Sequence, residues 1–239
     1  METYTEKFDQ DLDKIEHFQR FPAMKPYIGH NYGKDGQLKI LLIGESYYLP
    51  KDSTINKDFD NPDKWYNSKQ SDLYKKEEDC INCRQLLDRG WKDPGHKGHK
   101  IYRALDEALF DSGLFNTSKH EKTTPNVAYM NGFQRPSPET GSSIKPYFTD
   151  KDIEISVNVI KQVVSIIKPN LVIFVSKLSW DKLGRKLKDD KDIMDNKDMK
   201  IAHTYHPRAR GRSNWRNSPG GKKKFISIIQ TAKKSFRKS

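Results

Sequence analysis

Four short apolar runs, each followed by polar or turn-forming residues, constrain the fold of this chain more than any other feature. They lie at 39–43, 127–130, 171–175 and 200–204. Runs of this length and composition are typical of strands that are buried on both faces of a sheet. Segments with apolar residues at helical spacing separate and flank them, at 5–21, 73–89, 100–112, 153–167, 178–187 and 225–232. Strands that alternate with helices predict an α/β fold in which helices cover an open, mostly parallel sheet.

Two further segments stand out in this pattern. Thr149 precedes Asp152 by three residues just before the longest helical stripe, which is the spacing of a capping box. Residues 50–72 are polar and poor in aliphatic side chains, so we expect a polar insertion over about 50–100, near the mouth of the first strand.

The net charge of +12 is concentrated at the C-terminal end. The last acidic residue is Asp198, and the segment 199–239 contains 12 lysines and arginines, which account for the whole excess. Such a basic segment is typical of proteins that bind a polyanion, because each cation that neutralises a phosphate releases a counterion. A solvated basic tail is the alternative. We favour nucleic acid as the partner, because these charges flank a predicted strand (200–204) and a predicted helix (225–232).

No apolar run approaches the length of a membrane helix, and the first residues, METYTEKFDQ, lack the apolar block of a signal peptide. We therefore expect a soluble, intracellular, cytoplasmic protein that has no contact with a membrane.

Ligands of open α/β sheets bind beyond the carboxyl ends of the strands, so the residues after each apolar run are the ones to examine. These are 44–48, 131–136, 176–177 and 205–208.

Those strand ends carry a family resemblance. The stretches LLIGESYY (41–48), VAYMNGFQRP (127–136), PNLVIFVSKLSW (169–180) and HTYHPRARGRSNW (203–215) occur in an order that resembles the uracil-DNA glycosylase superfamily. The resemblance implies a three-layer α/β/α sandwich around a four-stranded parallel sheet, with residues 1–239 as a single domain. It also implies a monofunctional enzyme that hydrolyses the N-glycosidic bond of a base flipped out of DNA. We expect a monomer, with no organic cofactor.

Three residues are the candidates for catalysis. His206 matches the family residue that donates a hydrogen bond to the departing base, although a lone histidine is more often a cap or a core residue. Asn131 matches the residue that reads the base edge, and Asn-Gly is also a common turn. Classical members place an aspartate two residues after the glycine, where this chain has Ser46, and the carboxylate here is Glu45. Glu45 could orient water, accept from an exocyclic amine or cap a helix.

Other residues are expected to form the base pocket and the DNA contacts. Tyr48 matches the family tyrosine that closes the pocket, with Gly44 and Ser46 beside it. Tyr47 and Phe133 are candidates for stacking, although an aromatic residue near a strand end is more often part of the core. Gly132 leaves room for a larger base. Arg210 takes the position of the family wedge residue, and the other DNA contacts are expected at Arg208, Arg212 and Lys222. A flexible basic loop is the alternative for the arginines.

Cys80 and Cys83 are followed by His96 and His99 at a spacing similar to that of zinc ligands. One face of a packed helix also explains the two thiols, so we assign no metal. Two cysteines are too few for a disulfide framework or a four-thiolate iron–sulfur cluster.

Two other functions compete with the glycosylase. In a serine hydrolase, Ser46 would be the nucleophile, Asn131 an oxyanion donor and His206 the base. Such enzymes have an aspartate three residues before the histidine, where this chain has His203. In a non-catalytic DNA-binding module, the fold would be kept without the chemistry. The sequence does not identify the target base. Uracil is the default, and other deaminated or modified bases, including the modified cytosines of phages, are alternatives. The role is accordingly base-excision DNA repair or antiviral defence.

Overall fold

The computed structural model contains one five-stranded sheet, in the order β1-β3-β2-β4-β5. The structure describes residues 3–51, 53, 61–89, 99–118, 121–138, 141–194, 199–209 and 214–236. Strands β2 (Ile40–Tyr48), β3 (Ala128–Ser137), β4 (Leu171–Phe174) and β5 (Lys200–His203) are parallel, which confirms the four strands predicted from the apolar runs. The predicted number of four is wrong by one, because the two-residue strand β1 (Tyr27–Ile28) pairs antiparallel with β3. Two residues are too few to produce an alternation that a sequence pattern could reveal.

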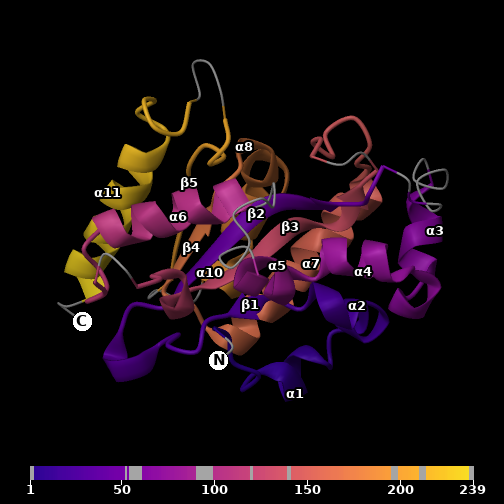
Figure 1. Cartoon of the computed structure of the whole chain (residues 1–239), viewed down its shortest axis with the longest axis horizontal. Coiled ribbons are helices and arrows are strands. Elements are labelled where there is room, and N and C mark those ends of the chain that lie inside the picture. The colour runs from indigo at the N-terminus through magenta and orange to yellow at the C-terminus, as the bar shows by residue number, and fades with distance from the viewer. Residues whose placement is uncertain are drawn as a thin grey trace.

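Helices lie on both faces of the sheet, as expected for this fold class (Figure 1). On one face are α4 (Lys75–Ile81), α5 (Cys83–Arg89), α6 (His99–Asp111) and α11 (Lys222–Phe236). The other face is covered by α7 (Asp150–Ile167) and by the helical run made of α8 (Lys177–Ser179), a π-helical turn (Trp180–Gly184) and α9 (Arg185–Lys188). A further short helix, α10 (Lys191–Met194), leads towards β5. Within the described residues, no helix combines the length and the apolar character that crossing a lipid bilayer requires.

Strands β2 and β3 continue well beyond their apolar runs. Gly44 is in register with Asn131, Ser46 with Phe133 and Tyr48 with Ser137, with an irregularity between Ser46 and Tyr48. The residues predicted to follow these two strands therefore lie within them. Backbone pairing holds them in a fixed relation to one another, and this is a firmer arrangement than two adjoining loops would give.

Two segments predicted as single helices are each broken in two. The segment 5–21 forms α1 (Asp9–Leu12) and α2 (Glu16–Arg20), and 73–89 forms α4 and α5. The second break occurs at Asn82, whose side-chain oxygen accepts the N–H of Gln85 and so caps α5. Apolar spacing alone does not reveal an internal cap of this kind.

The described part of the predicted polar insertion packs against the core. Helix α3 (Pro62–Asn67) carries Trp65, which is buried and stacks on Phe21 with ring centroids 4.3 Å apart. Next to it, the hydroxyl of Tyr66 donates to Asp152. Residues 54–60 and 90–98 lie outside the described residues. Trp65 and Tyr66 thus attach part of this stretch to the core, while the polar insertion at about 50–100 as a whole stays a prediction.

The predicted capping box at the start of α7 is confirmed, and it is part of a larger polar cluster. The Thr149 side chain accepts the N–H of Asp152, while the Asp152 carboxylate accepts the N–H of Thr149. The same carboxylate forms a two-pronged ion pair with Arg135, with two N···O distances of 2.7 Å. Both side chains have no exposed surface. This pair joins the end of β3 to the first turn of α7.

Candidate functional site

Glu45 lies near the carboxyl end of β2, and its two carboxylate oxygens are held separately. Ser143 donates a hydrogen bond to one oxygen at 2.5 Å, and Ser176 donates to the other at 2.8 Å. Ser176 is also the N-cap of α8, where it accepts the N–H of Ser179. The carboxylate therefore has a fixed orientation, and it is Ser176, not Glu45, that caps the helix.

Asn131 lies beside Gly44 in the neighbouring strand. A Cβ atom at position 44 would lie 2.4 Å from the Asn131 Oδ1 and 2.2 Å from the Tyr129 hydroxyl, so only glycine leaves room for these two side chains. The Tyr129 hydroxyl donates to Oδ1 of Asn131 at 3.1 Å. Because the oxygen of the amide is engaged in this way, its NH2 group is the part left to donate to a ligand.

His206 lies in the turn that follows β5, and its side chain is partly buried. Its Nδ1 accepts the backbone N–H of Arg208 at 3.2 Å, so in the neutral ring the proton is on Nε2. Burial lowers the pKa of His206 below its usual value, the Glu45 carboxylate opposes this by raising it, and Arg208 lowers it further. The neutral ring is therefore favoured near pH 7, with Nε2–H as a donor.

The three candidates lie at the same edge of the sheet. Ile43 is in register with Phe174, and Phe174 with His203, so the turn after β5 lies level with the pairing of Gly44 and Asn131. The charge of Glu45 acts on the pKa of His206, and it also contributes to raising the pKa of Tyr129, for which burial is the larger cause. A carboxylate, an amide and a neutral imidazole from three strand ends therefore lie at the same edge of the sheet.

The residues predicted to form the base pocket divide into two groups. Ser46 and Tyr48 are partly buried. Burial is the larger effect on the pKa of Tyr48 and raises it, whereas the charge of Arg208 lowers it, so Arg208 lies near Tyr48. By contrast, Phe133 has no exposed surface and packs on Phe148, with ring centroids 5.3 Å apart. Tyr47 is also buried, and its hydroxyl donates to the carbonyl of Met24. These two rings belong to the core, and neither offers an open face for stacking.

Gly132 does not provide the extra space expected from its lack of a side chain. A Cβ atom there would lie 3.0 Å from Leu183 and 3.1 Å from Ser179. The glycine permits close packing of β3 on the helical run behind the sheet, so its role is structural.

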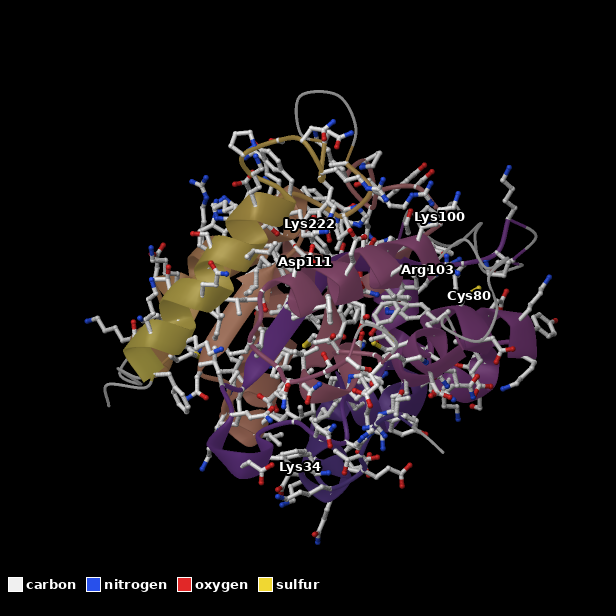
Figure 2. All side chains as sticks on the ribbon, turned by 60° about the vertical axis from the view of Figure 1, so that its left-hand side comes forward. Lys34, Cys80, Lys100, Arg103, Asp111 and Lys222 are labelled. Carbon is white, nitrogen blue, oxygen red and sulfur yellow. The ribbon has the colours of Figure 1, made fainter. Side chains whose placement is uncertain are left out.

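The basic residues predicted to contact DNA also differ in their surroundings. Arg208 is exposed. Lys222 forms ion pairs with Glu107 and Asp111 of α6, and only 17% of its side chain is exposed (Figure 2). Its charge is thus already compensated within the fold. Arg210 and Arg212 lie outside the described residues.

The surroundings of Cys83 are those of a core residue. Its thiol is buried and donates to the carbonyl of Tyr129 at 3.5 Å, and burial raises its pKa to about 12. His96 and the side chain of His99 fall outside the described part of the chain, in which no group of three metal-binding side chains occurs.

Three residues at this edge were not assigned a role from the sequence. Tyr129 could have been found, because it is two residues from Asn131 and so shares its face of the strand. Ser176 lies in a strand-end segment that the pattern did single out. Ser143 lies outside the helices and strands, between β3 and α7, and no periodicity marks it.

A comparison with models of protein families finds none that matches this chain, and a comparison with curated proteins finds no match either.

Proposed function

We propose that this protein is a DNA glycosylase that hydrolyses the N-glycosidic bond of a base flipped out of DNA. The proposal rests on the position of Glu45, Asn131 and His206, which are far apart in the sequence, at the carboxyl edge of the sheet, and on the charge of Glu45 acting on the pKa of His206. This edge is where ligands of parallel α/β sheets bind.

The chemistry requires a positioned water, a donor to the departing base and a means of reading that base. In the proposed reaction, the oxygen of water attacks C1′ as the bond from C1′ to the base nitrogen breaks, and the electron pair of that bond leaves with the base. Glu45 accepts the proton of the water. Because Ser143 and Ser176 hold both carboxylate oxygens, little reorganisation is needed during the step.

His206 is suited to stabilise the negative charge that develops on the base. Its neutral ring has Nε2–H as donor, because Nδ1 accepts from the backbone of Arg208. This hydrogen bond argues against the serine hydrolase, in which Nδ1 would have to donate to a carboxylate. The position at which such a hydrolase has an aspartate, three residues before His206, holds His203, and the ring of His203 stacks on Trp180 with centroids 4.6 Å apart.

Asn131 would read the Watson–Crick edge of the flipped base through its NH2 group, because its oxygen accepts from Tyr129. Uracil is the default target, and deaminated or modified bases, including the modified cytosines of phages, are the alternatives. Arg208, which is exposed, would bind a phosphate of the DNA. In this proposal the protein acts on DNA in the cytoplasm. Its role is DNA repair or antiviral defence.

Base release from defined duplexes tests the proposal. The protein is incubated with duplexes that contain uracil, hypoxanthine, hydroxymethylcytosine or glucosylated hydroxymethylcytosine, and abasic sites are detected by alkaline cleavage of the strand. We expect release from at least one duplex, and its loss in His206→Ala and Glu45→Gln without loss of DNA binding. Lys34→Ala, an exposed substitution outside the site, is the control and should retain activity.

Intact DNA in every duplex, and in the single-stranded versions, over a range of salt concentrations would refute the enzymatic function. If the protein binds these DNAs tightly without releasing any base, the non-catalytic DNA-binding module is the correct assignment.

A further inference from the structure

A groove of about 800 Å³ lies between β5 and α11, at the edge of the sheet. Most of its wall is apolar, made by Leu171, Met199, Ile201, Ala202, Pro219, Ile228 and Ala232. It is separate from the candidate active site, because the groove follows the length of β5 while the site lies beyond the end of that strand.

The backbone of β5 has an outer edge whose hydrogen-bonding groups meet no partner among the residues that the structure describes. Among the described residues, β5 pairs with β4 alone. The N–H of Lys200 and the N–H of Thr204 point to β4, where they bond to the carbonyls of Asn170 and Phe174. Because alternate residues of a strand bond to opposite sides, the backbone groups of Ile201 and His203 point outwards. The next outward N–H, that of Tyr205, bonds to the carbonyl of Gly220, so the open edge ends there.

The rim of the groove carries one sign of charge. Lys188, Lys200, Lys223 and Lys224 line it, and no acidic side chain does so among the described residues. Lys188 and Lys223 are exposed. An occupant must therefore bring negative charge together with apolar side chains and a backbone able to pair with an edge strand.

We propose that this groove binds an acidic segment of a partner protein in an extended conformation, as an additional strand on β5. In an extended peptide successive side chains point to opposite sides, so apolar residues can enter the groove while acidic ones meet the lysines. Nucleic acid fits less well, because no aromatic side chain lines the groove to stack on bases. A second copy of this chain would bring lysines against lysines.

Binding of a model peptide tests the proposal. The probe is a fluorescein-labelled peptide of alternating glutamate and valine, titrated with the full chain at low salt and followed by fluorescence anisotropy. We expect saturable binding, and Lys188→Glu combined with Lys223→Glu should raise Kd about tenfold. The matched control combines Lys14→Glu with Lys34→Glu, which makes the same change in net charge at exposed lysines outside the groove, and should leave Kd within about twofold.

Two further measurements examine the mode of binding. The amide NMR signals of Ile201 and His203 should shift more than those of Lys200 and Ala202, and a peptide that is N-methylated at alternate residues should not bind. The proposal is overturned if the peptide does not bind, which would mean that the lysines only protect the edge from pairing. It is also overturned if the groove variant and the control bind equally, or if single-stranded oligothymidine displaces the peptide from the groove.

Discussion

Breaking the buried ion pair between Arg135 and Asp152 should cost this fold much of its stability. Neither side chain has any exposed surface, and two hydrogen bonds of 2.7 Å join them. In Arg135→Met, the hydroxyl of Tyr66 and the N–H of Thr149 still donate to the carboxylate, but its counter-charge is lost. Removing one member of such a pair typically costs about 3–5 kcal/mol, and we expect a loss of unfolding free energy in that range.

The pKa of Asp152 makes the expected loss depend on pH. Burial is the largest single effect and acts to raise this pKa, but the hydrogen bonds and charge of Arg135, together with the hydrogen bonds from Thr149 and Tyr66, outweigh it, and the pKa lies below the usual value of 3.8. In the native protein, the stability that this group contributes is present above about pH 3.8 and is lost as the pH falls further. In Arg135→Met, burial acts without the cation, so the pKa of Asp152 should rise and the loss of stability should be smaller in acid than at neutral pH.

Urea unfolding followed by tryptophan fluorescence measures these free energies, with a double-mutant cycle of Arg135→Met and Asp152→Asn. Because both partners share one bidentate contact, we expect a coupling energy of about 2–3 kcal/mol. A single-variant loss below about 1 kcal/mol, together with a coupling energy near zero, would refute the view that this pair fixes α7 to β3.

Three more predictions follow from the site and the core. His17 is buried and its pKa is lowered by burial to about 3, so the native protein should lose about 2 kcal/mol of stability between about pH 7.5 and pH 5, as the unfolded chain takes up a proton. His17→Phe should remove this contribution of about 2 kcal/mol to the pH dependence measured by urea unfolding, and an unchanged slope would contradict the assignment. Ser176→Ala removes one of the two hydrogen bonds that hold Glu45, so release of the nucleobase should slow about tenfold. DNA affinity, measured by anisotropy, should stay constant. An unaltered rate would count against Glu45 as the proton acceptor. Gly44→Ala places a Cβ 2.4 Å from Asn131 Oδ1, so it should cost about 1–3 kcal/mol in urea unfolding and abolish base release, and a stable, active variant would show that the amide can move.

Much of the fold could be predicted because burial leaves a clear pattern in the sequence. The four apolar runs identified the four parallel strands, and the interval from Thr149 to Asp152 identified the start of α7. The failures occur where polar contacts decide the structure. Asn82 breaks a helix by capping the next one, and strand β1 is too short to show a period.

The candidate site was predictable in part for a similar reason. Residues that follow buried strands lie at one edge of a parallel sheet, so the segments that contain Glu45, Asn131 and His206 could be chosen before any geometry was known, and the family resemblance then selected these three residues within them. Their supporting groups are harder to find, because Ser143 reaches Glu45 from a part of the chain that follows no period. Lys222 illustrates the opposite difficulty, since a run of three lysines does not reveal which of them has acidic neighbours in space.

The two halves of the site depend on the chain in different ways. Tyr129, Asn131 and Gly44 are brought together by the pairing of two adjacent strands, whereas Glu45 needs Ser143 and Ser176 from segments outside that pairing. Loosening of the connection before α7 would therefore disturb Glu45, the proposed proton acceptor, while sparing Asn131, which we propose to read the nucleobase. In the proposed glycosylase, a change in this one loop could therefore abolish cleavage of the N-glycosidic bond while binding of the flipped base is kept.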